Sequence, residues 1–164
     1  MNRAKAIRAW IAAALWAFVA FPWVASAETV LHIPDSSAPA TCWEQAARRH
    51  QVNPWLLVAI AEVESGLRPT AIGRNANGSV DIGLMQINSL WLPELRRYGI
   101  AARDLLDPCV SVHVGAWVLA QKMRMHGNTW TAVGAYNAGS AVLRDRYARK
   151  VIEVLARRTG ALGL

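Results

Sequence analysis

Cysteine is scarce in this chain, and the residue patterns that hold metals, phosphates or acyl groups are missing. There are two cysteines among 164 residues. No glycine-rich phosphate loop follows a predicted strand, and no Gly-x-Ser-x-Gly elbow occurs. These absences argue against nucleotide binding and against the serine hydrolases built on that elbow. The four histidines lack the spacing of metal ligands; they are His32, His50, His113 and His126. We therefore expect neither a metal nor a cofactor.

Acidic residues are absent from the first 27 positions, which have the three-part layout of a secretory signal. Arg3, Lys5 and Arg8 precede an apolar run over residues 9–24, and Ala25-Ser26-Ala27 supplies the small residues that a signal peptidase reads. The alternative is an uncleaved membrane anchor, but this run of 16 residues is shorter than the roughly 20 that a spanning helix needs. We predict cleavage after residue 27 and an exported, periplasmic protein.

Cleavage would leave a chain of single-domain length with a modest positive charge. Removing 27 of the 164 residues leaves 137, enough for one hydrophobic core. Three of the 18 basic residues go with the signal, so 15 remain against 11 acidic ones, a net charge of +4. This balance suits anionic wall polymers, lipid head groups or nucleic acid, and ordinary solubility explains it equally well. No nucleic-acid motif is present, so we expect no nucleic-acid partner and take a monomer as the default.

Both cysteines lie beyond the signal segment, in the part that an oxidising compartment would receive. Two cysteines there most simply form one disulfide, Cys42–Cys109. Because their positions differ by 67, the bond would stabilise the fold by about 4 kcal/mol in the chain-entropy model. The alternative is a pair of buried free thiols.

Cap and turn signals divide the rest of the chain into several helices and one turn-rich stretch. Residues 28–40 have prolines and no helical periodicity, so we predict an extended segment before a domain over residues 41–164. Thr41 and Glu44 have capping-box form and open a helix to residue 50. Asn53-Pro54 opens a helix that is apolar nearly all round and therefore buried. The turn pair Asn77-Gly78 indicates a loop or small hairpin over residues 68–81. Further helices are expected over residues 89–98 and 108–126, in a segment leading to 136, and over 141–158. The predicted fold class is mainly α with a small β element.

Glu64 is the residue whose position indicates acid chemistry. Glu62 and Glu64 are two positions apart on a helix, so they point in different directions. Glu64 ends the apolar helix, where the helix dipole and burial both favour the protonated carboxyl group. A carboxylic acid that stays protonated near neutral pH can donate a proton to the leaving oxygen of a glycosidic bond. On these grounds alone, a surface glutamate at a helix end is the commoner explanation.

Three motifs in order strengthen the case for a glycan-cleaving enzyme. Glu64-Ser65-Gly66-Leu67 is followed by Gly83-Leu84-Met85-Gln86-Ile87-Asn88 and then by Ala135-Tyr136-Asn137-Ala138-Gly139. This trio resembles the soluble lytic transglycosylase family, and in particular its small single-domain members that accompany secretion systems and pili. The resemblance spans roughly residues 41–158. It implies a lysozyme-like fold, a groove between a helical core and the turn-rich residues 68–82, and peptidoglycan glycan strands as the substrate.

The resemblance also assigns roles to single residues. Glu64 corresponds to the family's catalytic acid and base, and Tyr136 corresponds to the tyrosine that hydrogen-bonds this glutamate. Tyr147 and Val151 match positions of the family's closing helix. Core packing is the alternative role for both Tyr136 and Met85. The residues expected to bind the substrate are Ser65, Met85, Gln86, Tyr136 and Asn137.

Asp81 supports a second interpretation, because residues 64–89 also resemble the active-site stretch of animal-type lysozymes. In such a hydrolase Glu64 donates the proton, and Asp81 acts as the second carboxylate, about 5 Å away in retaining enzymes. A structural role for Asp81 in closing the hairpin turn is a further alternative. A transglycosylase needs no second carboxylate, since its glutamate next takes the proton of the sugar's own C6 hydroxyl and a 1,6-anhydro ring closes. The third motif and the export signal favour the transglycosylase.

A non-catalytic protein on the same scaffold is a third interpretation, because fold does not determine function. Such a protein would bind the wall or assist an assembly. The retained Glu64 and the intact third motif argue against it. The resemblance further suggests that components of a secretion or pilus machine are partners, for which the enzyme would open the wall locally.

Overall fold

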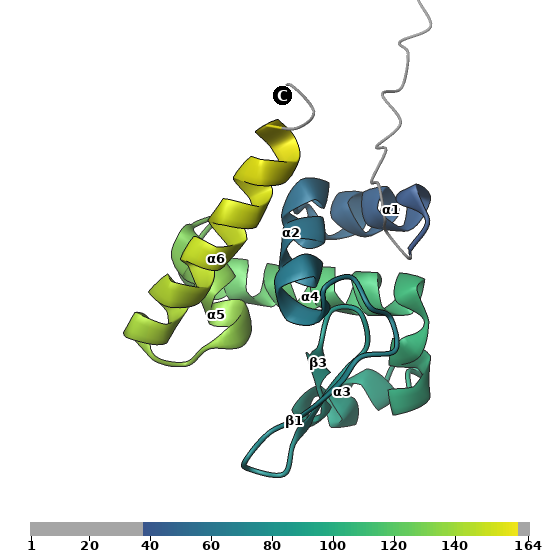
Figure 1. The fold of residues 1–164 in the computed structure, drawn as a ribbon. Helices are drawn as coiled ribbons and strands as arrows, with labels where there is room; N and C mark the ends of the chain where they lie inside the picture. Colours follow the sequence, from purple (N-terminus) through teal and green to yellow (C-terminus); the bar gives the residue numbers. More distant parts are fainter. Residues whose placement is uncertain (1–37, 161–164) are drawn as a thin grey trace, which may run out of the picture.

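The computed structural model describes residues 38–160, which form a group of helices with a small sheet at one end (Figure 1). The elements are α1 (Ala40–His50), α2 (Pro54–Ser65), β1 (Ile72–Arg74), β2 (Val80–Ile82), β3 (Ile87–Asn88), η1 (Ser89–Trp91), α3 (Leu92–Arg96), η2 (Ala102–Leu106), α4 (Pro108–His126), α5 (Trp130–Asn137) and α6 (Ala141–Gly160). The expected mainly α fold with a small β element is confirmed. The predicted signal peptide and residues 28–37 of the predicted extended segment lie outside the described residues.

Helix α2 lies in the centre of the helical part because it is apolar on nearly every side. Residues 57–61 are all completely buried. The Asn53 side chain accepts a hydrogen bond from the backbone N–H of Trp55 at 2.8 Å, and Pro54 takes the first helical position, as predicted. Gly66 ends the helix in the left-handed conformation at φ 62°. Glu64 is thereby placed in the last turn of a buried helix.

A disulfide joins α1 to α4. Cys42 on α1 is bonded to Cys109 at the start of α4, with the two Cα atoms 5.4 Å apart. The predicted pairing is therefore confirmed. Because α1 and α4 are packed against one another as well, the bond closes a long loop over an interface that is already formed.

The capping box predicted at the start of α1 is wrong. The helix begins at Ala40, two residues earlier than a cap at Thr41 would place it, and no side chain caps it. Pro39 occupies the cap position, and its carbonyl oxygen accepts a hydrogen bond from the backbone N–H of Cys42 at 2.9 Å. Because the first turn is closed by this backbone bond, Thr41 lies inside the helix and not at its cap.

The turn-rich stretch forms an antiparallel sheet in the order β1-β2-β3. Asn77 and Gly78 form the tight turn between β1 and β2, with Gly78 at φ 82° and the Asn77 side chain accepting from the backbone N–H of Ser79. Asp81 on β2 lies opposite Gly73 on one side and Asn88 on the other. This register places the polar side chains of Asp81 and Asn88 next to each other.

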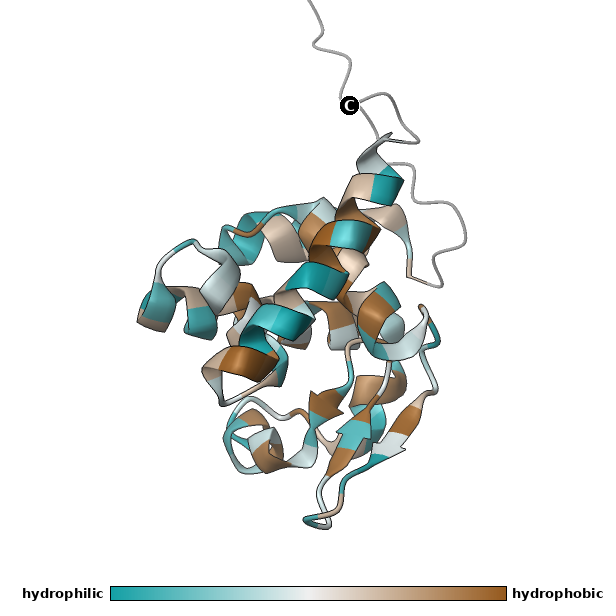
Figure 2. Cartoon of the chain, turned by 60° about the vertical axis from the view of Figure 1, so that its left-hand side comes forward, coloured by the Kyte–Doolittle hydropathy of each residue, from teal (hydrophilic) through white to brown (hydrophobic). Residues whose placement is uncertain are grey.

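Helix α6 packs along one face against α2 and α5. Its buried residues recur with helical spacing and are Tyr147, Ala148, Val151 and Val154. Hydrophobic and hydrophilic residues accordingly alternate along this helix in Figure 2. The start of α6 approaches α5 so closely that a Cβ added at Gly134 would lie 2.4 Å from the carbonyl oxygen of Arg144. Among the described helices, none is long and apolar enough to cross a membrane.

Candidate active site

A cavity of about 540 Å³ lies between the helical part and the sheet. Its walls come from segments far apart in the sequence: the end of α2, strand β2, the turn after it, η1 and the end of α5. The lining residues that matter for the chemistry are Glu64, Asp81, Gln86, Trp91, Tyr136 and Asn137. The groove is thus built at the junction that the sequence predicts, with carboxyl groups on both sides.

Glu64 is the carboxyl group with the most perturbed environment in this groove. The hydroxyl of Tyr147 donates a hydrogen bond to Oε1 of Glu64 at 2.6 Å. The pKa of Glu64 is raised to about 7, chiefly by burial and to a smaller extent by the negative charge of Asp81. Hydrogen bonds from Tyr147 and Asn137 and the charge of Lys150 act in the opposite direction and limit the rise. Near neutral pH this carboxyl is therefore present in both protonation states. It can give a proton and later take one back.

Tyr136 contacts a different partner from the one predicted. Its hydroxyl donates to the carbonyl oxygen of Met85 at 2.9 Å, and the tyrosine that donates to Glu64 is Tyr147. Tyr136 still lines the groove, and burial, followed by the charge of Glu64, raises its pKa well above the usual value. The sequence showed Tyr147 only as a position on the closing helix. The available signal was its place on the buried face of that helix, where a tyrosine hydroxyl needs a partner.

The side chains of Met85 and Ser65 are buried and do not line the groove, so their roles in substrate binding stay predictions that the side-chain positions do not support. Met85 is completely buried, and it packs so closely on α4 that a Cβ at Gly115 would lie 2.7 Å from its Cε. Ser65 is 3% exposed, and its hydroxyl lies 2.7 Å from the carbonyl oxygen of Leu84, to which it donates. Both residues instead fix the loop after β2 against the helices.

Gln86 and Asn137, in contrast, border the groove as expected. Gln86 is held in the left-handed region at φ 46°, a conformation that side-chain-bearing residues seldom adopt. Its amide group donates to the carbonyl oxygens of Gly83 at 2.8 Å and of Ala71 at 3.1 Å. These bonds tie the loop to the sheet and leave the remaining surface of Gln86 facing the cavity.

Asp81 lies on strand β2 and is held by two carboxamides. Asn75 donates to one carboxylate oxygen and Asn88 to the other, each at 2.8 Å. The hairpin turn itself is made by Asn77, but the bond from Asn75 links Asp81 to the start of this turn, so a structural role for Asp81 in holding the hairpin stays a prediction. Both asparagines line the same cavity. Asp81 therefore presents a fixed carboxylate to the groove, across from the helix that carries Glu64.

Trp91 is a groove residue that sequence reasoning missed. The sequence favours a core position for most of the tryptophans and selects none for the groove. Trp91 lines the cavity, its ring meets that of Trp117 edge-on at 5.2 Å, and the ammonium group of Lys122 lies 5.7 Å from its centre. An aromatic face fixed in this way suits stacking on a sugar ring. Trp91 lies on a short 3-10 helix, and the local sequence does not determine which way this helix turns its side chains.

Family membership is decided by a comparison with known domains. Residues 41–152 match the model of the transglycosylase SLT domain. The chain belongs to this family. The prediction of a lytic transglycosylase is thus confirmed at the level of the family, and the three sequence motifs fall within the matched SLT region.

Individual relatives of this SLT-family protein agree with the family match. Invasion protein IagB of Salmonella typhimurium is 48% identical over 123 residues, which cover 72% of this chain and 77% of that protein. Protein IpgF of Shigella flexneri is 43% identical over 120 residues, covering 73% and 79% respectively. Among solved structures, an inactive variant of lytic transglycosylase Slt from Pseudomonas aeruginosa superposes with a TM-score of 0.62 at 22% identity. That match covers 77% of this chain but 24% of the larger protein, so it shows the shared fold.

Proposed function

We propose that this protein is a peptidoglycan lytic transglycosylase that cleaves the β-1,4 bond between N-acetylmuramic acid and N-acetylglucosamine. The observation that carries the proposal is Glu64, a carboxyl with a pKa of about 7 facing a groove of about 540 Å³. A pKa near the working pH suits a group that must act as an acid and then as a base. The family match supports the same reaction class.

The reaction needs no group beyond Glu64 and the substrate. Protonated Glu64 gives its proton to the glycosidic oxygen, and the bond from this oxygen to C1 of muramic acid breaks. The resulting carboxylate takes the proton of the C6 hydroxyl while O6 bonds to C1, which closes the 1,6-anhydro ring. Glu64 ends protonated as it began, and no water is consumed. Tyr147, at 2.6 Å from the carboxyl, stabilises the ionised form between the two steps.

A hydrolytic muramidase is the second candidate, and the position of Asp81 favours it. Its carboxylate borders the same groove and is fixed by Asn75 and Asn88. In a hydrolase this group would be the nucleophile or would stabilise the cationic sugar. In the transglycosylase the charge of Asp81 would stabilise the cationic sugar, and Asp81 would not act as a nucleophile.

Mass spectrometry of fragments released from purified peptidoglycan distinguishes the two reactions. We expect products ending in 1,6-anhydro-muramic acid; products heavier by one water would make the protein a hydrolase. The Asp81→Asn variant should keep the anhydro products and lose less than about tenfold in kcat/KM, or about 1.4 kcal/mol. A near-complete loss of cleavage in this variant, together with water-containing products of the wild type, would contradict the transglycosylase.

Cleavage should fall as the pH rises through about 7, because the first step needs the protonated form of Glu64. Replacing Tyr147 with phenylalanine removes a bond that lowers the pKa of Glu64, so the decline should move to higher pH. We expect a shift of about one pH unit, since a hydrogen bond to a charged group contributes roughly 1.5 kcal/mol. The pH profile of kcat/KM measures it, and an unchanged or lowered midpoint would show that Tyr147 does not tune the acid.

The cellular setting is part of the proposal. We infer that the protein is exported through residues 1–27 and opens the wall locally for an envelope-spanning secretion or pilus machine. The support is the resemblance to small members of the family and the similarity to a protein named for invasion. Deletion of the gene should then impair assembly of such a machine, and complementation with the Glu64→Gln variant should fail to restore it.

A further inference from the structure

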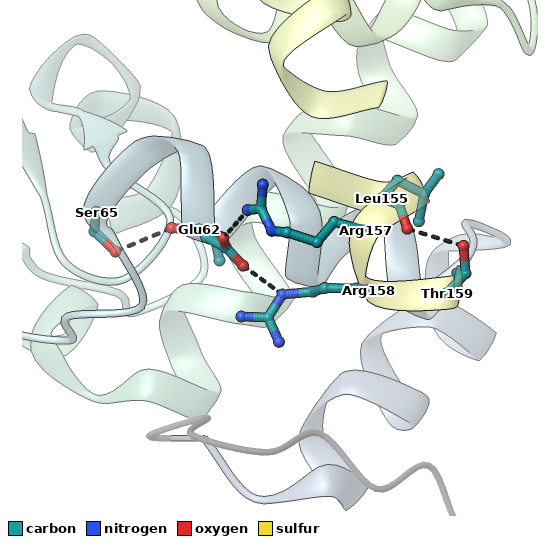
Figure 3. A network of polar contacts seen from close by, with 7 residues as sticks. Glu62, Ser65, Leu155, Arg157, Arg158 and Thr159 are labelled. Carbon is teal, nitrogen blue, oxygen red and sulfur yellow. Dashed lines mark hydrogen bonds and ion pairs between the residues drawn. The ribbon is translucent and has the colours of Figure 1, made fainter. Parts of the chain in front are cut away.

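A cluster of three charged residues joins the last turn of α2 to the last turn of α6. Glu62 takes one guanidinium on each carboxylate oxygen: Arg157 Nη2 lies 2.5 Å from Oε1, and Arg158 Nε pairs with Oε2. Figure 3 shows Glu62 reaching across from α2 between the two arginine side chains. We refer to Glu62, Arg157 and Arg158 as the charge clamp.

The charge clamp differs from an ordinary surface ion pair. The side chains of Glu62 and Arg158 are 22% and 19% exposed, whereas exposed pairs contribute little to stability. Glu62 also lies in the last turn of α2, where the helix dipole disfavours a negative charge. The same dipole effect favours cations in the last turn of α6, where both arginines lie. The carboxylate at this position is therefore compensated from the neighbouring helix.

Helix α6 consequently contacts the last turn of α2 at two separate points. Tyr147 reaches Glu64, and the arginines reach Glu62, two residues away on α2. Along α6 these contacts are ten and eleven residues apart, about 15 Å in an α-helix. The other end of α6 is fixed by its close approach to α5 at Gly134. A helix held at both ends and in the middle cannot rotate or slide without breaking one of these contacts.

We propose that the charge clamp is a positioning device for the catalytic acid: it sets the register of α6 on α2 and so keeps Tyr147 bonded to Glu64. None of the three clamp residues lines the groove, so they act through Tyr147 and not on the sugar. The description of Glu64 as the catalytic acid rests on the proposed function. The link from the Glu62 contacts through α6 to Glu64 follows from the contacts alone and does not depend on that function.

Loss of the clamp should be visible at Glu64 itself. The groups that act on this carboxyl come from α6, β2 and α5, and they are Tyr147, Lys150, Asp81 and Asn137. Two of the three groups that lower its pKa, Tyr147 and Lys150, are on α6. A small shift of α6 that breaks the Tyr147 bond without separating α6 from α2 would weaken both contributions, so the pKa of Glu64 should rise.

The test is a ¹³C NMR titration of the glutamate carboxyl groups, with Glu64 identified by its absence in the Glu64→Gln variant. In an Arg157→Gln/Arg158→Gln variant we expect the midpoint of Glu64 to rise by roughly 0.5 pH unit, a part of the shift expected for Tyr147→Phe. An Arg146→Gln/Arg149→Gln variant is the matched control. It removes two exposed cations from the same helix and should leave the midpoint unchanged.

Two further variants separate positioning from a general effect on stability. In a Tyr147→Phe background the clamp variant should produce a much smaller additional shift, because the bond that the clamp maintains is already gone and only the weaker contribution of Lys150 can still change. Arg157→Lys/Arg158→Lys keeps both charges and should restore most of the wild-type midpoint. An unchanged midpoint in the clamp variant, or a full shift in the Tyr147→Phe background, would overturn the proposal.

Folding problems and failure of the proposed function can both be recognised. If the double variant does not fold, the Glu62→Gln variant tests the proposal instead. This substitution removes a negative charge near Glu64, and loss of that charge alone would lower the titration midpoint of Glu64. A rise in the midpoint can therefore come only from displacement of α6. The titration needs no substrate. A shift without any peptidoglycan cleavage by the wild type would uphold the coupling and reject the proposed activity.

Discussion

Replacing Glu64 with glutamine is expected to reduce peptidoglycan cleavage by about 10²- to 10⁴-fold, the range that general acid–base catalysis contributes. Glutamine has nearly the same shape and can still accept the hydrogen bond from Tyr147. It cannot give a proton to the glycosidic oxygen or take one from the C6 hydroxyl. Release of soluble fragments from labelled peptidoglycan measures the effect.

The same substitution should not unfold the protein. Burial raises the pKa of Glu64 from 4.5 to about 7, so the folded protein binds this proton more tightly than the unfolded chain does. The carboxyl therefore contributes stability below pH 4.5, and this contribution is lost as the pH rises through 7. At pH 8 a neutral glutamine avoids the buried charge, and the free energy of unfolding should stay equal or increase.

A control on a surface acid makes the comparison specific. Glu153 is exposed on α6, and Glu153→Gln should leave cleavage and stability unchanged. Activity of Glu64→Gln within tenfold of the wild type would reject Glu64 as the acid. Absence of cleavage by the wild type itself would instead favour the interpretation in which this scaffold only binds the wall.

The second large effect concerns Gly83, the first residue of the motif that carries Gln86. Gly83 has φ 78°, and a Cβ there would lie 2.0 Å from the backbone carbonyl oxygen of Leu105 in η2. Gly83→Ala should therefore lower the free energy of unfolding by about 3 kcal/mol or more, from the left-handed backbone and the overlap together. Proteins of this size are stable by about 5–15 kcal/mol, so this is a large fraction.

Gly78 provides the matched control for this substitution. It has a similar φ of 82°, but nothing lies within 4 Å of its added Cβ. Gly78→Ala should lower stability by only about 1 kcal/mol, which is the backbone contribution alone. Urea denaturation of both variants measures the difference. Equal losses would show that the loop after β2 can move away from η2.

The parts of the fold that sequence predicts well are those with local signals. Helix α2 is an example, since Asn53, Pro54 and Gly66 mark its ends within a few residues of the positions they affect. The turn at Asn77 and Gly78 is another. By contrast, Thr41 and Glu44 have the right spacing for a cap, but the preceding proline starts the helix first. Local patterns compete, and the stronger backbone constraint determines the result.

The site was predictable in its position and less so in its contacts. Resemblance to a family locates Glu64, but it does not give the direction of a neighbouring side chain. Met85 is buried because Gly115, 30 residues further along, leaves room for it on α4. Tyr147 reaches Glu64 because α6 docks on α2, a contact across 83 positions. Such pairings depend on tertiary packing, which a single sequence does not contain.

The hydrogen bonds around the loop after β2 bear on how this enzyme could be re-engineered. Ser65 holds Leu84, Tyr136 holds Met85, and Met85 fills the space at Gly115. Residues of the three sequence motifs therefore contact one another around this loop. The contacts involve α2, the loop itself, α4 and α5. A donor loop transplanted from a relative would have to bring its own serine, tyrosine and glycine partners. Exchanging one motif at a time would break these contacts, whereas exchanging all of them together would keep them.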